Sequence, residues 1–430
     1  MTKKKYTILF IHQNFPGQYK HLAPALAKME NIDAYSISKE DKSLPNIKHY
    51  KYKINKGNTP GVNTLTVEFE TKMIRAKAVA DLCLEMKKEG IIPDVILSHP
   101  GWGESFLLKE VWPDAKFLNY FEFYYNTKDS DIDFDLKETQ RPNYDFDLIT
   151  KLRARNAPFL SAFLQSDSMI TPTEFQKSTA PEIFKDRISV VHEGIDTKQI
   201  KPNPDANLRF KNETNGKIEN ITKKDKVITF VNRNLEPYRG YHIFMRSLPE
   251  IIKKNPDAYI LIVGGDQVSY GATPKEGSYK DIYYNEIKDK IPKDNKIRFC
   301  GVVPYNIYLN LIGISSVHVY LTYPFVLSWS MLEAMSMETL IIGSKTKPVE
   351  EIIKDKKNGL LVDFFDHKGL ASKVNEVLSN PDQYSSIKKE ARKTIIDNYD
   401  LESICLPKQI EIFKKLLKWL LRIYLMMFYY

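Results

Sequence analysis

The sequence lacks the features that mark membrane-spanning and secreted proteins. It has no stretch of roughly twenty uncharged apolar residues, the length that a membrane-spanning helix needs. Its first residues, MTKKKYTILFIHQNF, have neither the long apolar core nor the small-residue cleavage site of a secretion signal. The three cysteines, Cys83, Cys300 and Cys405, lie far apart and show no disulfide or metal spacing. We therefore expect a cytoplasmic protein.

Motifs for nucleic-acid binding are also missing. The net charge is +9, from 63 basic and 54 acidic residues, and such an excess favours nucleic acid, anionic lipid or a phosphorylated ligand. No zinc-finger spacing, RNP-type motif or basic recognition helix accompanies this charge. Nucleic acid is the least supported of the three partners, and we expect none.

What is present is an alternation of strands and helices. A chain of 430 residues is long for a single core, so two domains are expected. Each half begins with an apolar strand, a polar loop and an amphipathic helix: 6–11, 12–17 and 19–29 in the first, and 227–231, 232–240 and 241–248 in the second. This pattern predicts an α/β protein with two Rossmann-like domains in tandem.

The stretch from Val227 to Pro249 has the order of a phosphate-binding βα unit. Arg233 and Arg239 lie in its loop, and a helix N-terminus follows directly. A helix N-terminus attracts anions, and guanidinium groups donate paired hydrogen bonds to phosphate oxygens. The stretch alone is equally compatible with a diphosphate site and with a basic surface loop.

Two side chains of the first half follow or interrupt predicted strands. His99 comes directly after the buried strand 93–98, at the sheet edge where open α/β sheets bind ligands. Glu122 lies within the aromatic strand 116–125, where a carboxylate needs a partner or a ligand. The alternative for His99 is a loop histidine that is hydrogen-bonded to the backbone.

An acidic irregular segment spans residues 126–147. Its alternating aspartates, at 129, 131, 133 and 135, do not form a calcium loop, because Phe134 and Gln140 replace the required glycine and glutamate. One interpretation of these aspartates is a metal-binding Asp-x-Asp motif. A solvated acidic loop is favoured, because the segment lies well past the preceding strand.

The remaining segments set the domain limits. We predict an N-terminal domain at 1–200, a linker at 201–226 that is rich in Pro, Asn and Lys, a C-terminal domain at 227–400 and a final helical segment at 401–430. Lys414, Lys418 and Arg422 form a basic stripe on this helix, opposite Trp and Leu residues. Residues 414–430 are predicted to lie on an anionic membrane surface. The alternative is that they pack back onto the first domain. We expect a division, in which the part before about Lys415 packs on the protein and the part after it is exposed.

Several motifs together resemble glycosyltransferase family 4, the glycosyl transferases group 1. The loop NRNLEPYRG (232–240) is similar to the family's phosphate loop, and Arg239 stands where lysine is usual. The motifs HPGWGE (99–104), HEGID (192–196), Glu333-Ala334-Met335 and NGLLV (358–362) follow in the family order. The chain also looks like a member of a subgroup with HQNFPGQ and YLTYPFVLSWS. It departs from the family at Phe325, where a carboxylate that holds donor-sugar hydroxyls is usual, and at Glu338, where glycine is usual.

The resemblance implies the GT-B fold, with two Rossmann-like domains facing across a cleft. It implies a retaining, hexosyltransferase-like enzyme of polysaccharide biosynthesis that needs no cofactor or metal and takes a nucleotide-diphosphate sugar. The acceptor would be a glycan or a lipid-linked molecule, which would make the protein cytoplasmic or peripheral on the inner face of the plasma membrane. The catalytic residues implied are His99, Arg233, Arg239 and Glu333. The donor-binding residues would be these last three with Gly265, Leu327, Ser328, Trp329 and Ser330. The acceptor side would comprise His12, Gln13, Asn14, Gly17, Gln18 and Glu122.

Two other functions stay open at this point. A sugar-nucleotide epimerase on the same fold would need acid/base carboxylates near the sugar, and the missing carboxylate at Phe325 counts against it. A non-catalytic nucleotide-sugar binding partner is the reading that Phe325 favours.

Overall fold

The computed structural model describes residues 5–139, 142, 145–211, 216 and 218–428, with side chains up to residue 417 except at residue 211. The chain divides into two compact units. The first comprises residues 1–128, 141–194 and 401–430, and the second comprises residues 129–140 and 195–400.

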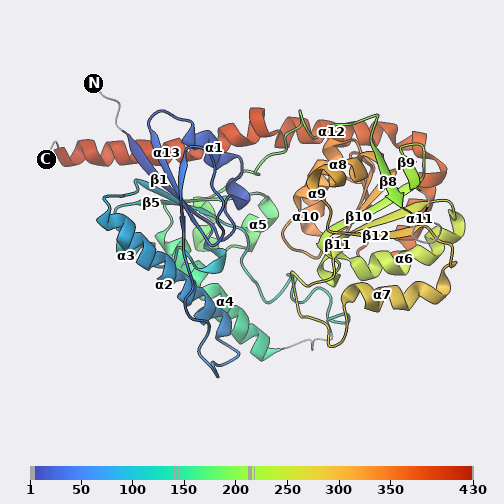
Figure 1. Cartoon of the computed structure of the whole chain (residues 1–430), viewed down its shortest axis with the longest axis horizontal. Coiled ribbons are helices and arrows are strands. Elements are labelled where there is room, and N and C mark those ends of the chain that lie inside the picture. Colours follow the sequence, from blue (N-terminus) through green and yellow to red (C-terminus); the bar gives the residue numbers. More distant parts are fainter. Residues whose placement is uncertain (1–4, 140–141, 143–144, 212–215, 217, 429–430) are drawn as a thin grey trace. The chain divides into compact units, whose positions relative to one another are not determined.

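The first unit is built on a parallel sheet in the order β3-β2-β1-β4-β5-β6-β7. Its strands are β1 (Tyr6–Ile11), β2 (Ile32–Ser38), β3 (Ile47–Lys51), β4 (Val95–Ser98), β5 (Lys116–Tyr120), β6 (Ser168–Thr171) and β7 (Ile188–Val190). The inner strands are mostly buried, as parallel strands covered on both faces are, and the edge strands β3 and β7 are less so. The helices of this unit are α1 (Leu22–Ala27), α2 (Val67–Lys88), α3 (Leu108–Val111), α4 (Phe146–Gln165), α5 (Glu174–Thr179) and α13 (Leu406–Phe428). The helices α1 and α13 cover one face of the sheet, and α2 and α3 cover the other (Figure 1).

The last helix, α13, contributes to the core of the first unit. Phe413, Leu416 and Leu417 are buried in the cluster that includes Phe10 of β1 and Leu22 of α1. Lys414 and Lys415 lie between these positions and are exposed. The helix therefore packs against its own unit at least as far as Leu417. The part of the predicted membrane segment from residue 418 onward lies outside the described side chains.

The second unit has a parallel sheet in the order β12-β11-β10-β13-β14-β15. Its strands are β10 (Val227–Asn234), β11 (Tyr259–Gly265), β12 (Ile297–Gly301), β13 (Val317–Tyr320), β14 (Ile341–Ser344) and β15 (Leu360–Val362). The helices are α6 (Tyr241–Lys254), α7 (Tyr279–Ile287), α8 (Tyr305–Ile314), α9 (Trp329–Ser336), α10 (Lys347–Ile352), α11 (His367–Ser379) and α12 (Ser385–Tyr399). Both sheets are wholly parallel, which confirms the predicted α/β class.

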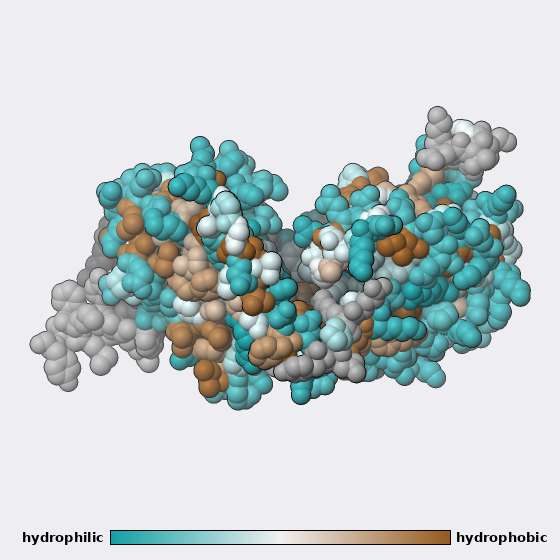
Figure 2. Space-filling view, turned by 90° about the horizontal axis from the view of Figure 1, so that it is seen from below, coloured by the Kyte–Doolittle hydropathy of each residue, from teal (hydrophilic) through white to brown (hydrophobic). Residues whose placement is uncertain are grey.

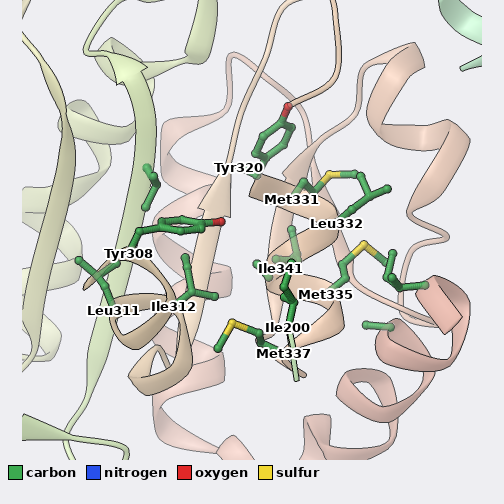
Figure 3. Close-up of a cluster of buried hydrophobic side chains, with 14 of the residues drawn as sticks. Ile200, Tyr308, Leu311, Ile312, Tyr320, Met331, Leu332, Met335, Met337 and Ile341 are labelled. Carbon is green, nitrogen blue, oxygen red and sulfur yellow. The ribbon is translucent and has the colours of Figure 1, made fainter. Parts of the chain in front are cut away.

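A hydrophobic cluster fixes the two helices that adjoin the candidate site. Figure 3 shows Tyr308 and Ile312 on the side of α8 that faces α9, in one cluster with Met331 and Met335, whereas Leu311 lies on the other side of α8. These side chains are nearly or fully buried, and the burial of each is worth about 1.5–3 kcal/mol. This packing holds the start of α9 and the residue Glu333 in place.

Two segments differ from what the sequence predicts. The predicted linker, residues 201–226, contains the antiparallel hairpin of β8 (Asn207–Lys211) and β9 (Ile218–Thr222), and Leu208 and Ile221 enter the core of the second unit. The acidic segment is not a solvated loop: Asp131 and Asp135 are buried within the second unit. These two carboxylates accept hydrogen bonds from tyrosine hydroxyls of that unit, and Asp135 also lies beside a histidine of the unit.

The surface of the described part is mainly hydrophilic. On the face shown in Figure 2, hydrophobic side chains are scattered among hydrophilic ones. Among the helices of the described residues, none has the length and apolar character needed to cross a bilayer. The described residues also contain no group of three or more His, Cys, Asp or Glu side chains arranged to hold a metal ion.

Candidate functional site

The phosphate loop of the second unit joins β10 to α6 through a short helical turn, Pro237–Arg239. Gly240 ends this turn and begins α6 with φ of 68°, a left-handed conformation that glycine adopts without strain. A Cβ at Gly240 would lie 2.3 Å from the Cβ of Leu321, so a side chain has no room. Gly240 stands at the N-cap position of α6, so the cap residue has no side chain to accept the first N–H groups of this 14-residue helix. The N–H of Tyr241 donates to the Glu236 carbonyl at 3.4 Å, and within the described residues no side chain accepts the N–H groups of His242 and Ile243.

The two arginines of this loop have different surroundings. Arg239 is 7% exposed, and its Nη1 donates hydrogen bonds to Thr322 Oγ1 and to the Val326 carbonyl, both at 2.9 Å. Arg233 is exposed, and its side chain makes no hydrogen bond or ion pair with the part of the chain that the structure describes. Arg239 is therefore held in a fixed position at the helix start, whereas Arg233 is open to solvent.

Glu236 is a component of this loop that sequence reasoning missed. Its Oε2 accepts hydrogen bonds from the backbone N–H groups of Ser269 at 2.8 Å and Tyr270 at 3.1 Å. Burial raises the pKa of this carboxyl. Glu236 thereby attaches the segment after β11 to the phosphate loop. Its position between the two arginines in the sequence is the one feature that could have indicated a role in this loop.

Gly265, a predicted donor-binding residue, lies at the end of β11 beside the same loop. Its carbonyl accepts the N–H of Leu235 at 2.9 Å. A Cβ at Gly265 would lie 2.5 Å from Asn234 Oδ1. The obstacle to a side chain here is thus the Asn234 side chain, since the nearest backbone atom, the Arg233 carbonyl oxygen, would lie at 3.5 Å.

Phe325, the position at which the resemblance leads us to expect a carboxylate, is 3% exposed. Its ring lies edge-on to Tyr270 at 4.8 Å and to Tyr238 at 5.5 Å, between ring centroids. The guanidinium carbon of Arg239 lies 5.8 Å from the Phe325 ring centroid and 5.3 Å from that of Tyr270. Phe325 therefore packs into an aromatic cluster that supports Arg239.

The start of α9 carries the other predicted donor contacts. Ser328 caps the helix, and its own N–H donates to Tyr320 Oη at 2.8 Å. Glu333 is 5% exposed, and its Oε1 accepts a hydrogen bond from Tyr305 Oη at 2.8 Å. Sequence reasoning did not find Tyr305 as the partner of Glu333, because α8 is distant in sequence. Leu327 is buried, and Trp329 and Ser330 are half-buried.

The first unit brings four of its predicted residues together: hydrogen bonds link His12, Gln18 and Glu122, and His99 lies within ion-pair distance of Glu122. His12 Nε2 lies 2.6 Å from Gln18 Oε1, and Gln18 Nε2 donates to Glu122 Oε1 at 3.3 Å. His99 Nε2 lies 3.4 Å from Glu122 Oε2. The Nδ1 atoms of the two histidines accept backbone N–H groups, from Asn14 and Gly101, which leaves Nε2 as the donor nitrogen of each ring. His12 therefore donates from Nε2 to Gln18 Oε1, and the Nε2 atom of His99 faces the Glu122 carboxylate at 3.4 Å.

Aromatic rings hold the histidines. His99 is stacked between Trp102 at 4.3 Å and Tyr120 at 5.4 Å, and the ring of His12 meets it edge-on at 5.2 Å. Burial, together with repulsion by His99, lowers the pKa of His12 to about 3. His12 is therefore neutral at physiological pH.

The other predicted acceptor-side residues support His12. A Cβ at Gly17, whose φ is 47°, would lie 2.2 Å from the His12 ring, so only glycine lets this ring sit there. The Gln13 carbonyl accepts the N–H of Lys39 at 3.1 Å. Asn14 contributes the backbone N–H that fixes the His12 tautomer.

Two family models match the sequence of this chain. The model of the glycosyl transferase family 4 group matches residues 31–200, and that of the glycosyl transferases group 1 matches residues 211–394. The chain belongs to these glycosyltransferases.

Individual relatives agree with this assignment. YtcC of Bacillus subtilis is 28% identical over 243 residues, 54% of this chain and 56% of YtcC. The GDP-mannose-dependent alpha-(1-6)-phosphatidylinositol monomannoside mannosyltransferase of Mycolicibacterium smegmatis is 22% identical over 214 residues, 48% of this chain and 51% of that protein. The chain thus spans about half the length of these curated relatives. The Anabaena protein HepE, solved in complex with UDP and glucose, superposes with a TM-score of 0.65 at 14% identity, covering 95% of this chain and 100% of HepE. This likeness shows the GT-B fold.

Proposed function

We propose that this protein transfers a sugar from a nucleoside diphosphate donor to a hydroxyl of a glycan or a lipid-linked acceptor. The observation that carries the proposal is the fixed guanidinium of Arg239 beside the uncapped N-terminus of α6. The UDP and glucose of the HepE complex and the GDP-mannose of the mycobacterial relative support a nucleoside diphosphate donor and leave the base open.

The second unit would stabilise the leaving group. As the bond from the anomeric carbon to the phosphate oxygen breaks, negative charge develops on the diphosphate. Arg239, Arg233 and the N–H groups of α6 supply positive charge where it develops. These groups make a divalent metal unnecessary, and Glu333 would accept hydrogen bonds from the ribose hydroxyls.

The first unit would bind the sugar and the acceptor. His99, Glu122, Gln18 and His12 offer donors and a carboxylate in a fixed order, which suits the hydroxyls of a sugar. We propose retention of configuration without a protein nucleophile. The acceptor oxygen bonds to the anomeric carbon on the face that the diphosphate leaves, and the departing phosphate oxygen takes the acceptor's proton.

The primary experiment is a thermal-shift screen against UDP, GDP, ADP and CMP, followed by incubation with the matching radiolabelled nucleotide sugars. A ligand at a hundred times its dissociation constant stabilises the folded protein by about 2.7 kcal/mol. Transfer or hydrolysis of the sugar supports the proposal. Exchange at a sugar carbon would indicate an epimerase, and binding alone would indicate a non-catalytic partner; either result overturns it.

Metal independence is tested separately. Activity should survive EDTA, because the arginines and the helix already supply positive charge. Loss of activity in EDTA with recovery on adding manganese would contradict this part of the proposal.

A membrane-bound acceptor would require the protein to reach a lipid surface, and residues 414–430 are the proposed contact. Because Leu416 and Leu417 belong to the core of the first unit, the chain should be stopped after Leu417 to leave this core intact. Full-length protein should co-sediment with anionic liposomes, and the shortened chain should do so less. Equal binding by both proteins would show that residues 418–430 do not contribute to membrane binding.

A further inference from the structure

Residues 129–139, here called the acidic strap, lie within the second unit although the chain on both sides belongs to the first. The strap has no helix or strand of its own. Its attachment to the second unit is therefore carried by side chains.

Three carboxylates of the strap each accept a hydrogen bond from a tyrosine hydroxyl of the second unit, all at 2.8 Å: Asp131 from Tyr238, Asp135 from Tyr323 and Glu138 from Tyr283. Asp131 is 2% exposed and Asp135 is 6% exposed. Burying a carboxylate is unfavourable unless its oxygens are hydrogen-bonded, so these partners are needed for the strap to stay in place.

Further contacts reinforce the attachment. His242 Nε2 lies 3.2 Å from Asp135 Oδ2, and Arg246 Nη1 donates to Glu138 Oε2 at 3.0 Å. The ring of Phe134 stacks on Phe365 with centroids 5.1 Å apart. Together these contacts bury a segment that composition alone would leave in solvent.

Two of the three tyrosines flank the phosphate loop. Tyr238 directly precedes Arg239 in sequence, and Tyr323 directly follows Thr322, whose hydroxyl accepts a hydrogen bond from Arg239. The N–H of Tyr323 donates to the Tyr238 carbonyl at 2.9 Å, and the two rings lie 4.7 Å apart. Asp131 and Asp135 thus fix the two backbone segments that hold the Arg239 side chain.

Tyr283 differs from these two. It lies on α7, and its strap partner Glu138 also pairs with Arg246 of α6. The chain therefore provides an internal control, in which the same hydroxyl-to-carboxylate bond is made by a tyrosine that adjoins neither Arg239 nor Thr322 in sequence. The Tyr283 ring packs on Tyr241 and His242, and a phenylalanine at this position keeps that packing.

We propose that the acidic strap is a positioning element for the donor site: through Tyr238 and Tyr323 it orders the backbone that holds Arg239 against the diphosphate. This inference rests on the proposed function, because it assigns the diphosphate to Arg239. It gives Asp131 and Asp135 a role in donor binding that requires neither contact with the donor nor a metal ion.

The test compares three single variants, Tyr238→Phe, Tyr323→Phe and Tyr283→Phe. Each variant keeps the aromatic ring and removes the tyrosine hydroxyl that donates a hydrogen bond to one carboxylate of the strap. All three should lower the melting temperature by a similar amount. The first two should weaken binding of the nucleoside diphosphate found in the thermal-shift screen by about tenfold, and Tyr283→Phe should leave it unchanged. Equal affinity in all three variants would overturn the inference.

A second comparison asks whether the effect passes through Arg239. In an Arg239→Ala background, Tyr238→Phe should cause little further loss of diphosphate affinity, because the group that it positions is already absent. Losses that simply add would show that Tyr238 acts independently of Arg239, against the inference.

Hydrogen exchange of the free protein gives a readout that does not depend on nucleotide binding. Backbone amides of residues 238–244 should exchange faster in Tyr238→Phe and Tyr323→Phe than in Tyr283→Phe. If the unaltered protein binds no nucleoside diphosphate, the proposed function fails, and the exchange data still decide whether the strap orders this loop. Unchanged exchange in all three variants overturns the inference in either case.

Discussion

Replacing Gly240 with alanine is the sharpest test of how the phosphate loop is built. Gly240 has φ of 68°, and a left-handed conformation costs a residue with a side chain about 1–2 kcal/mol. The added Cβ would also lie 2.3 Å from Leu321 Cβ, a contact that only a backbone shift can relieve. Overpacking of this kind costs roughly 1–3 kcal/mol. The total expected loss of stability in the second unit is about 2–5 kcal/mol.

Gly277→Ala is the matched control. Gly277 has φ of 64°, and nothing lies within 4 Å of the position that an alanine methyl group would take, so this variant carries the conformational cost without the collision. Its expected loss is about 1–2 kcal/mol. The difference between the two variants isolates the close approach of Gly240 to Leu321.

Urea unfolding followed by the fluorescence of Trp329 measures this difference, because Trp329 is the only tryptophan in residues 195–400. The other three tryptophans are replaced by phenylalanine in every protein of this series. Calorimetry in the otherwise unaltered chain then measures diphosphate affinity, which should fall in Gly240→Ala and stay unchanged in Gly277→Ala. Equal unfolding midpoints for the two variants would refute the reasoning from the Leu321 contact.

Three other substitutions test the remaining parts of the site. Arg239→Ala should weaken nucleoside diphosphate binding by roughly 1.5–3 kcal/mol, since it removes a charged hydrogen-bond donor; calorimetry that finds unchanged affinity would exclude Arg239 from the phosphate site. His99→Ala should lower kcat of sugar transfer much more than it weakens diphosphate binding, and unchanged turnover would leave His99 with a structural role only. For His12, the folded-state pKa of about 3 lies below the ordinary value of 6.5, so the unfolded chain binds the proton more tightly and stability is lost as pH falls from 6.5 toward 3. This contribution amounts to about 2 kcal/mol at pH 5 relative to pH 7.5, so His12→Gln should lose less stability than the unaltered protein between these pH values in urea unfolding. The same pH dependence in both proteins would contradict the assignment of a buried neutral His12.

Local patterns in the sequence were sufficient to predict the elements around the phosphate loop. The apolar run that ends at Val231, the polar loop and the amphipathic helix from Tyr241 predict β10, the turn and α6, because each element follows from its own residues. The first strand, Tyr6–Ile11, has the predicted bounds for the same reason. Arg239 was placed correctly at the helix start because its position follows from the chain order alone.

The acidic strap could not be predicted in this way. Alternating aspartates favour solvent when they are considered locally, and nothing near them in sequence offers a buried partner. Their partners Tyr238 and Tyr323 are 107 and 188 residues away. Hydrogen bonds over such separations leave no periodic signal, so only the folded chain reveals them.

Phe325 illustrates a different limit, because the resemblance predicts a departure at this position but not what the side chain does in the folded protein. Its side chain is buried beside the guanidinium of Arg239, with 5.8 Å between the guanidinium carbon and the ring centroid. A carboxylate at this distance in a buried site would attract Arg239 strongly and compete with phosphate oxygens for it. An aromatic ring supports the guanidinium through its face and its packing while leaving the full positive charge available. Phe325 and Arg239 are therefore parts of one arrangement. In it, Tyr270 and Phe325 contact the planar cation, Tyr238 packs against both rings, and Asp131 of the acidic strap accepts a hydrogen bond from Tyr238.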